Sequence, residues 1–412
     1  MSEALLSIPY VQIVGPTHFL VVAVLTQHFG LTAAVFGFIA ALPGWCAMLQ
    51  FFATPRMAAR LGPRRMSFTV QGIDLAIWFS VLVALPWIGN AGTTAATIFF
   101  VVVFITSQGV RAINRVAHPT WTCQWLPARV RGSFFGNRNG WSTTVLIIFA
   151  VAIVPLLQRT DSWTAYQLFL AVAVLMKVAS FYLQTQIRTP AGAESASECH
   201  GVPAATPTLS GLRDWRGFLE AGRPFIIFTG LLALAGLFRS ITGPFRTLYL
   251  LQEVGFSPAM LAQFSLVELI VTAAAFPLWA YVGRKTSFAF VIRLTLFGFV
   301  AEALAWGLLP GSAVTGFYLL KAGGAFVVTG FNLALITQQM NLLPKANGAT
   351  YFSLAIAVDA VCGGLTPMLF GLALDEAGRN AVMYRLGFLV TASGVMVAAL
   401  LFWLQSRNSK SP

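Results

Sequence analysis

The sequence predicts an all-α integral membrane protein with twelve transmembrane helices arranged as two pseudo-symmetric bundles of six. Three observations predict this fold: the composition, the spacing of apolar segments and an internal repeat. Of the 412 residues, 57% are hydrophobic and 9% are charged, and the mean hydropathy is +0.77. A soluble protein carries about 25% charged residues, so this chain lacks the polar side chains that would cover a water-facing surface.

Twelve apolar segments can be placed along the chain, because a spanning helix needs about 20 residues. Hydrophobic patterning places them at residues 6–28, 33–55, 66–89, 95–122, 133–157, 163–187, 223–251, 258–282, 286–309, 314–340, 349–373 and 381–404. The alternative to this count is that one of the twelve is a re-entrant segment.

The longest polar interruption, residues 188–222, is rich in Ala, Ser, Pro and Gly. That composition is typical of a flexible linker. We therefore expect a six-helix bundle over residues 1–187, a cytoplasmic linker over 188–222 and a second six-helix bundle over 223–412.

Basic residues are concentrated in alternate loops. With the N-terminus inside, the inner loops and the C-terminal tail hold fifteen Lys and Arg residues, whereas the outer loops hold about three. Because cytoplasmic loops carry the excess of Lys and Arg, both termini are expected to be cytoplasmic, in a bacterial inner (plasma) membrane. The net charge of +13 is therefore interpreted as orientation in a lipid bilayer, and no nucleic-acid partner is expected. The first residues lack the basic region and cleavage site of a signal peptide, so they are assigned to the first span.

An internal repeat relates the two halves of the chain. The pattern L-x-Q-x-x-G occurs at residues 25–30 and again at 250–255, each time between the first two spans of a half. The basic run at 62–65 after span two matches 283–285 after span eight, and W-L-P at 125–127 matches L-L-P at 342–344. Three matches in the same order predict two copies of one six-helix unit.

The loop over residues 55–65, P-R-M-A-A-R-L-G-P-R-R, resembles the G-x-L-a-D-R-x-G-R-R/K signature of the major facilitator superfamily. Residues 279–285 are its echo in the second half, and residues 119–132 are similar to the P-x-x-x-R-G loop after span four. The resemblance covers nearly the whole chain. It implies a monomeric secondary transporter rather than an enzyme, with a small-molecule substrate and no cofactor. The conformational motif of the superfamily would fall on Gly62, Arg64, Arg65, Gly283, Arg284 and Lys285.

The sequence also departs from the superfamily pattern. Pro55 stands at the signature's Gly position and Ala59 at its Asp position, so the charge relay attributed to that Asp cannot operate in the same form. The G-P-x-x-G-G pattern of drug antiporters is missing from residues 142–151, which disfavours drug efflux.

Ionisable residues within the spans indicate the substrate pathway, because each costs about 3 kcal/mol on insertion scales and normally faces a cavity or a partner. Cationic side chains outnumber acidic ones. The cationic residues are Arg111, Arg115, Arg138, Lys177, Arg239, Arg246, Arg293 and Lys321, and the acidic residues are Asp74, Glu268, Glu302 and Asp359.

Helical spacing groups several of these residues, because positions three, four and seven apart share one face. In span four, one polar stripe runs through Gln108, Arg111, Arg115, His118 and Thr122. The resemblance implies that spans one, four, seven and ten line a central cavity. The expected substrate-binding residues are Gln108, Arg111, Arg115, Arg239, Arg246, Lys321 and Asn332. The resemblance places Asp74, Lys177, Arg293 and Glu302 on peripheral helices, where structural roles are expected.

Two interpretations of the arginines stay open. In the first, their guanidinium groups bind the carboxylate or phosphate of an anionic substrate. In the second, they pair with Glu268, Asp359 or backbone carbonyls and fasten helices together. The spacing along spans seven and eight places Glu268 within reach of either Arg239 or Arg246.

Energy coupling requires a group that changes charge. No GxxxxGK[ST] sequence occurs, so ATP is not expected to drive transport. The candidate proton carriers are Glu268, Asp359 and His18. The four cysteines lack ligand spacing, and neither HExxH nor GxSxG occurs, so neither a metal site nor enzyme chemistry is expected.

The sequence therefore predicts secondary active transport of a small organic anion by alternating access, with proton coupling or exchange. The alternative within transport is uptake of a neutral, sugar-like or amphiphilic solute, with the arginines structural. The alternative from another class is a non-transporting membrane receptor or a lipid scramblase on the same scaffold.

Overall fold

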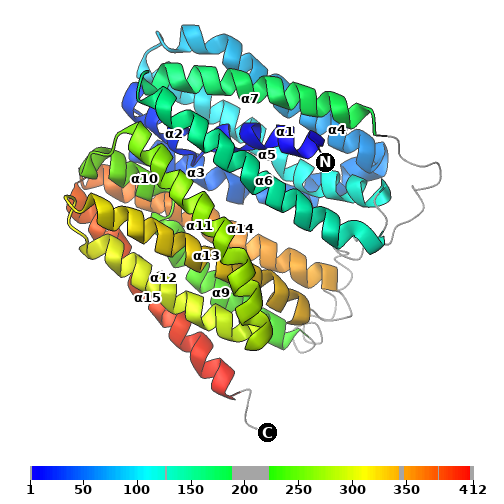
Figure 1. Ribbon diagram of the computed structural model, residues 1–412, viewed down its shortest axis with the longest axis vertical. Coiled ribbons are helices and arrows are strands. Elements are labelled where there is room, and N and C mark those ends of the chain that lie inside the picture. The colour runs from blue at the N-terminus through cyan, green and yellow to red at the C-terminus, as the bar shows by residue number, and fades with distance from the viewer. Residues whose placement is uncertain (1, 126–127, 188–221, 343–347, 379, 409–412) are drawn as a thin grey trace. The chain divides into compact units, whose positions relative to one another are not determined.

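The computed structural model describes residues 2–125, 128–187, 222–342, 348–378 and 380–408 (Figure 1). Over these residues the chain is helical apart from short connections, and they contain no β-strand. The chain forms two compact units, Met1–Pro207 and Thr208–Pro412. The boundary between them falls within the expected linker, of which residues 188–221 lie outside the described part of the chain.

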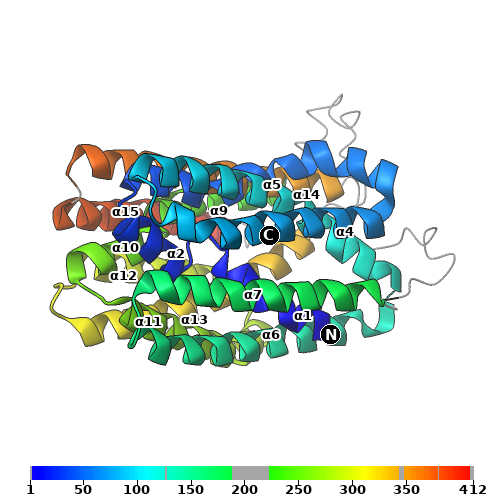
Figure 2. The ribbon, with the colours of Figure 1, turned by 90° about the horizontal axis from the view of Figure 1, so that it is seen from above.

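The helices of the N-terminal unit follow the predicted spans. They are α1 (Ser2–Ile13), α2 (Phe19–Ala23) with a π-helical turn at Val24–His28, α3 (Ala33–Ala47), α4 (Leu49–Ile88), α5 (Thr93–Trp125), α6 (Ala128–Leu157) and α7 (Ser162–Thr185). Figure 2 shows α4 and α7 running side by side along one direction, and these two helices pack on each other.

The helices of the C-terminal unit repeat this order. They are α9 (Arg223–Thr242), α10 (Phe245–Tyr249) with a π-helical turn at Leu250–Val254, α11 (Pro258–Lys285), α12 (Phe288–Leu308), α13 (Val314–Leu342), α14 (Gly348–Glu376) and α15 (Ala381–Asn408). In the described residues, nine helices are long and apolar enough to cross a membrane. Shorter apolar helices occupy Phe19–His28, Ala33–Ala47 and Trp141–Leu157.

The first span of each unit is interrupted, whereas the sequence predicts continuous helices over 6–28 and 223–251. The breaks lie at the dipeptides Gly15-Pro16 and Gly243-Pro244, between α1 and α2 and between α9 and α10. Proline has no backbone N–H and its ring crowds the preceding turn, so it ends a helix. The first break brings α1 to an end just after Tyr10, whose side chain contributes to the site described below.

Spans two and three are joined at Gly62. Helical segments on either side of this residue run together as α4, and Gly62 itself has φ 70° and ψ 159°, outside the helical region. A residue with a side chain is strained at such a φ value. The conformation explains why the predicted motif contains a glycine at this position.

The predicted L-x-Q-x-x-G repeat is also a structural repeat. Gly30 and Gly255 both have positive φ, 66° and 80°. The residue after each glycine donates its N–H back to the leucine that begins the motif, Leu31 to Leu25 at 2.9 Å and Phe256 to Leu250 at 2.8 Å. Such bonds satisfy carbonyl groups at a helix C-terminus. The next helix then begins with a hydroxyl cap, Thr32 accepting from the N–H of Val35 and Ser257 from that of Met260.

The same helix pairs pack in both units. In the N-terminal unit, α1 packs on α6 and α7, and both α3 and α7 lie against the pair formed by α4 and α5. The equivalent contacts in the C-terminal unit are α9 with α14 and α15, α11 with α13, and α12 with α13 and α15. The duplication therefore extends from local motifs to packing.

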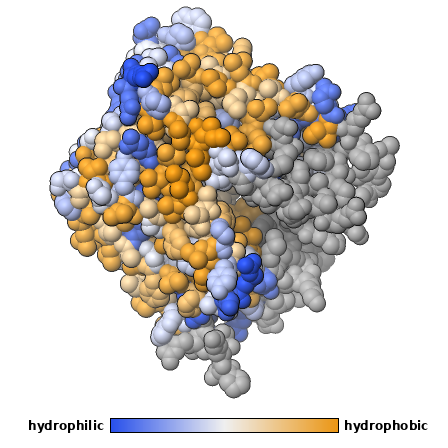
Figure 3. Space-filling view, viewed as in Figure 1, coloured by the Kyte–Doolittle hydropathy of each residue, from blue (hydrophilic) through white to orange (hydrophobic). Residues whose placement is uncertain are grey.

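Large apolar side chains lie on the surface. Leu175, Leu308 and Leu319 are 68%, 70% and 70% exposed, and Figure 3 shows hydrophobic residues over much of the described surface on the visible face. Soluble proteins rarely expose extended apolar areas. The surface fits a protein whose helices are surrounded by lipid.

Candidate functional site

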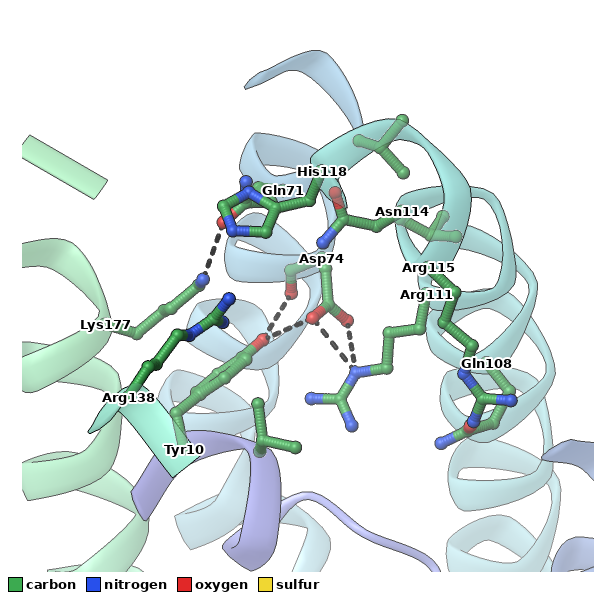
Figure 4. Close-up of a pocket in the computed structure, with 13 residues that line it drawn as sticks. Tyr10, Gln71, Asp74, Gln108, Arg111, Asn114, Arg115, His118, Arg138 and Lys177 are labelled. Atoms are coloured by element: carbon green, nitrogen blue, oxygen red, sulfur yellow. Dashed lines mark hydrogen bonds and ion pairs between the residues drawn. The ribbon is translucent and has the colours of Figure 1, made fainter. Parts of the chain in front are cut away.

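A polar cavity of about 290 Å³ lies inside the N-terminal unit (Figure 4). It is lined by side chains from α1, α4, α5, α6 and α7. Its polar lining consists of Tyr10, Gln71, Asp74, Gln108, Arg111, Asn114, Arg115, His118, Arg138 and Lys177.

The wall formed by α5 is the polar stripe that the sequence predicts. Gln108, Arg111, Arg115 and His118 occur at spacings of three and four residues, so one face of the helix presents all of them to the cavity. Thr122, the last residue of the stripe, does not line the cavity and donates its hydroxyl to the carbonyl of His118 at 2.8 Å.

Asp74 on α4 is the centre of the hydrogen-bond network. Its carboxylate accepts from Nε of Arg111, at 3.1 Å for Oδ2 and 3.3 Å for Oδ1. It also accepts from the hydroxyl of Ser107 at 2.7 Å and that of Tyr10 at 3.0 Å. Trp78 fixes the hydroxyl of Ser107 by donating to it at 2.8 Å. These bonds hold the Asp74 carboxylate on one side of Arg111.

The terminal nitrogen Nη2 of Arg111, unlike Nε, does not bind Asp74 or any other described residue. This nitrogen is also buried. The guanidinium carbon lies 5.3 Å from the centroid of the Tyr10 ring. Figure 4 shows the terminal nitrogens of Arg111 directed away from Asp74. An unpartnered buried donor is costly, so this nitrogen is suited to a ligand that accepts hydrogen bonds.

Lys177 on α7 occupies the opposite side of Tyr10, with Nζ 5.9 Å from the ring centroid. It donates to Gln71 Oε1 at 2.7 Å. Gln71 and Gln184 exchange hydrogen bonds, and Gln184 donates to the carboxylate of Glu3 at 3.1 Å. Glu3 does not line the cavity, and two amide side chains separate it from Lys177.

Two further polar atoms of the cavity lack partners among the residues that the structure describes. They are Nε2 of Gln108 and Nδ1 of His118, and both are buried. Three residues of α5 that line the cavity therefore carry buried polar atoms without partners among the described residues.

Asp74 and Lys177, which the resemblance places on peripheral helices, both line the cavity with Arg111. No signal in the sequence points to Tyr10, and Arg138 is grouped with the ionisable residues of the spans but not with the expected substrate-binding residues. A signal for Asp74 was present in the sequence, since Ser67, Gln71 and Asp74 share one helical face of α4.

In the C-terminal unit, Arg246 forms an ion pair with Glu302 of α12. The Glu302 side chain is 5% exposed. Gly324 of α13 makes room for it, because a Cβ atom at this position would lie 2.4 Å from Glu302 Oε1. Glu302 thus fastens α10 to α12, in agreement with the structural role that the sequence predicts.

Glu268 pairs with neither Arg239 nor Arg246, although the sequence leaves both pairings open. Glu268 instead forms an ion pair with Lys321 of α13, at a partly exposed position where the two side chains are 45% and 24% exposed. Asn332, on the same helix as Lys321, has an exposed side chain.

Arg239 on α9 packs against aromatic rings. Its guanidinium carbon lies 3.7 Å from the centroid of Phe299 and 5.4 Å from that of Phe331. No carboxylate of the described residues lies within 4.0 Å of it. Asp359 approaches the same helix, because its Oδ1 would lie 3.8 Å from a Cβ atom at Gly236.

His18 lies in the connection between α1 and α2 rather than within a helix. Its ring is 4.6 Å from that of Phe19, and its Nδ1 is buried without a hydrogen-bond partner in the described part of the chain. The structure does not bring it into the cavity lining.

The conformational motif residues lie at helix junctions. Arg64 follows Gly62 and lies over the ring of Phe68 at 5.9 Å, and Arg65 is exposed. In the second half, Gly283 packs tightly against Phe288, Arg284 is exposed, and Lys285 lies 5.6 Å from the ring centroid of Tyr281.

In the described part of the chain, no group of three or more His, Cys, Asp or Glu side chains is placed to hold a metal ion. The two described cysteines, Cys46 and Cys362, are free thiols.

No protein-family model matches the sequence, and no curated protein matches it. Solved structures do match over nearly the whole chain. The D-xylose-proton symporter superposes with a TM-score of 0.71 at 13% identity, covering 98% of this chain and 96% of that chain. The nucleoside transporter NupG matches with a TM-score of 0.68 at 13% identity, covering 98% of both chains.

A bacterial homolog of the human lysosomal transporter Spinster has a TM-score of 0.68 at 15% identity, covering 98% of this chain and 95% of that chain. An inward-open XylE from E. coli, described as a proton:xylose symporter of the major facilitator superfamily, has a TM-score of 0.68 at 13% identity, covering 97% of this chain and 94% of that chain. Together with the duplicated six-helix units, these matches identify the fold of this chain as that of the major facilitator superfamily transporters.

Proposed function

We propose that this protein is a secondary active transporter that moves a small organic anion across a bacterial inner membrane by alternating access. The superfamily fold supports transport as the activity. The cavity of the N-terminal unit supports an anion as the substrate, and both termini are proposed to be cytoplasmic.

The observation that carries the proposal is the geometry of Arg111. Asp74 holds its Nε, while Nη2 of this cavity-lining residue is buried and has no hydrogen-bond partner among the described residues. A guanidinium that served only to fasten α4 to α5 would not need a second, unsatisfied edge. A planar fork with free donors suits a carboxylate or phosphate group.

The charges around the cavity support the same class of substrate. Four cationic side chains line it, Arg111, Arg115, Arg138 and Lys177, and Asp74 is the one carboxylate in the described lining. A cation inside a membrane protein normally faces a partner or a water-filled cavity, because its desolvation is costly. An anionic solute would offset the remaining positive charge while it is bound.

We propose that coupling uses protons or exchange and that Glu268 and Asp359 remain candidate proton carriers, with His18 the weakest of the three. Asp74 joins them, because it lies beside the proposed substrate group and is held by Arg111. Binding of an anion to Arg111 would weaken the attraction between Arg111 and Asp74. Protonation of Asp74 and occupancy of the cavity would then be linked.

The second candidate is uptake of a neutral solute. The Asp74–Arg111 ion pair favours it, because this pair also fits a purely structural role. The structural matches include a D-xylose-proton symporter and a nucleoside transporter.

Proteoliposomes that contain the purified full-length protein separate the two candidates. We expect uptake or counterflow of labelled small carboxylates, with no uptake of xylose or uridine. Arg111→Gln should reduce carboxylate uptake about 100-fold or more, in line with the loss of a buried charged contact. Arg159→Gln, at an exposed position between α6 and α7, removes the same charge outside the cavity and is the control. Uptake of neutral solutes that is insensitive to Arg111→Gln would overturn the anion proposal.

A further inference from the structure

The first 187 residues contain only three carboxylate side chains, those of Glu3, Asp74 and Asp161. Asp161 caps the N-terminus of α7 by accepting from the N–H groups of Trp163 and Thr164. Lys177 lies further along the same helix, about 24 Å away at ~1.5 Å per residue. Asp161 therefore does not offset the charge of the cavity, and two carboxylates remain to do so.

Each of these two carboxylates is already associated with a cationic side chain of the cavity. Asp74 pairs with Arg111, and Glu3 faces Lys177 through the amides of Gln71 and Gln184. Arg115 and Arg138 make no ion pair with any described residue. The cavity thus has two cationic side chains without a counter-charge in residues 1–187.

The two uncompensated cations lie on different sides of the cavity. Figure 4 shows Arg138, from α6, beside Lys177 on one side of Asp74, and Arg115, from α5, beside Gln108 and Arg111 on the other side. Tyr10 lies between the two sides, with Arg111 5.3 Å and Lys177 5.9 Å from its ring centroid. One compact anionic group cannot lie against both sides at once.

We propose that the solute bound in this cavity carries two acidic groups joined by a short carbon chain. One acidic group binds at Arg111 and Arg115, and the other binds at Arg138 and Lys177. This inference rests on the proposed function, because it specifies the charge of the transported anion. The volume of about 290 Å³ equals that of about ten water molecules at ~30 Å³ each, which is enough for a dicarboxylate of this kind.

The charge count favours a dianion over a monoanion. A single negative charge would neutralise one of Arg115 and Arg138 and leave the other without a counter-charge in the occupied cavity. Two negative charges, one on each side, neutralise both. Electrostatic complementarity of this kind determines which ligand is selected.

Binding of matched pairs of acids to the purified full-length protein tests the proposal. Each linear dicarboxylate from oxalate to adipate is compared, by isothermal titration calorimetry, with the monocarboxylate of the same carbon number. We expect at least one dicarboxylate to bind about tenfold or more tightly than its matched monocarboxylate. Succinamide, which has the shape of succinate without charge, is expected not to bind.

The preference should depend on both sides of the cavity. Arg115→Gln and Arg138→Gln should each reduce the preference for the dicarboxylate to within about twofold of its matched monocarboxylate. Arg115→Lys and Arg138→Lys keep the charge and should retain most of the preference. These conservative variants also provide folded controls, and thermal unfolding of every variant identifies loss of fold. Arg159→Gln should leave the preference unchanged.

The outcomes distinguish this inference from the function on which it rests. If monocarboxylates bind as tightly as the matched dicarboxylates, the dianion is ruled out and anion transport stands. If neither class binds more tightly than succinamide, both proposals fail. If the dicarboxylate preference is present but survives Arg115→Gln and Arg138→Gln, the assignment to these two side chains is wrong.

Discussion

The two units pack the same pairs of helices, and each pairs an arginine with a carboxylate of its third span, but the side chains around the two ion pairs differ. In the N-terminal unit, Arg111 of the fourth span pairs with Asp74 of the third, within a network that includes Tyr10 and Lys177. In the C-terminal unit, Arg246 of the seventh span pairs with Glu302 of the ninth, and Arg239 packs on phenyl rings. The duplicated backbone therefore fixes helix packing and caps but leaves the polar chemistry of each unit free to diverge.

The difference has a physical consequence for what each unit can bind. Arg239 makes cation–π contacts with phenyl rings, and such a contact is worth about 0.5–2 kcal/mol. A phenyl ring has no polar group that could extend a hydrogen-bond network to a ligand. Tyr10 offers a ring to Arg111 and also a hydroxyl to Asp74, so the N-terminal network remains polar around its cavity. On this basis we assign the anion-binding site to the N-terminal unit.

The largest effect is expected from separating Asp74 and Arg111. Asp74→Asn or Arg111→Gln alone leaves one buried charge without its partner and should destabilise the protein by about 3–5 kcal/mol. The double variant removes both charges and should regain most of that stability. Unfolding curves in detergent measure this cycle. If each single variant unfolds as the wild type does, the pair does not support the fold.

A smaller loss of stability is expected from disturbing the Arg246–Glu302 ion pair of the C-terminal unit. Gly324→Ala places a Cβ atom 2.4 Å from Glu302 Oε1 and should displace this carboxylate from Arg246, at a cost of about 1–3 kcal/mol. Gly323→Ala is the matched control, because nothing lies within 4 Å of a Cβ atom there and alanine favours the helix. The prediction fails if the two variants have the same unfolding temperature.

A smaller effect is expected at Arg239. A double-mutant cycle of Arg239→Met and Phe299→Leu should give a coupling of about 0.5–2 kcal/mol. The cycle with Phe331→Leu should give less, because that ring centroid is 5.4 Å away instead of 3.7 Å. Equal coupling to the two rings would contradict the geometry.

Uptake by Arg239→Gln, in a folded protein, tests the separate prediction that Arg239 lies on the substrate pathway.

The smallest effect concerns the features that both units share. Thr32→Ala and Ser257→Ala each remove a hydroxyl that caps a helix, and each should cost about 1 kcal/mol. Because the caps occupy equivalent places in the repeat, the two costs should agree closely. A large difference between them would indicate that the units diverge in local structure as well as in polar chemistry.

Much of the fold was predictable because its signals are local. Each apolar segment is long enough to indicate a helix by itself, and the repeat of glycine and hydroxyl caps at 25–32 and 250–257 is readable in the sequence. The interruptions at Gly15-Pro16 and Gly243-Pro244 were missed, although proline is a known helix breaker. They lie inside otherwise continuous apolar runs, and apolar composition alone does not separate a broken span from an unbroken one.

The site was predictable only where one helix presents it. Gln108, Arg111 and Arg115 share a face of α5 by periodicity, so the sequence grouped them. Asp74 and Lys177 come from other helices, and spacing along a helix does not indicate which neighbour its polar face meets. Glu268 illustrates the same limit. Its position along the span does not indicate which neighbouring helix the side chain meets, and its partner in the structure is Lys321 of α13.

The most direct test of the central claim is anion binding by the double variant Asp74→Asn/Arg111→Gln. This variant keeps the net charge of the cavity but removes the guanidinium that we place against the substrate. We predict that the protein folds and that its affinity for the dicarboxylate bound most tightly by the wild type falls about tenfold or more. An unchanged affinity in the folded double variant would contradict the assignment of the anion site to this cavity.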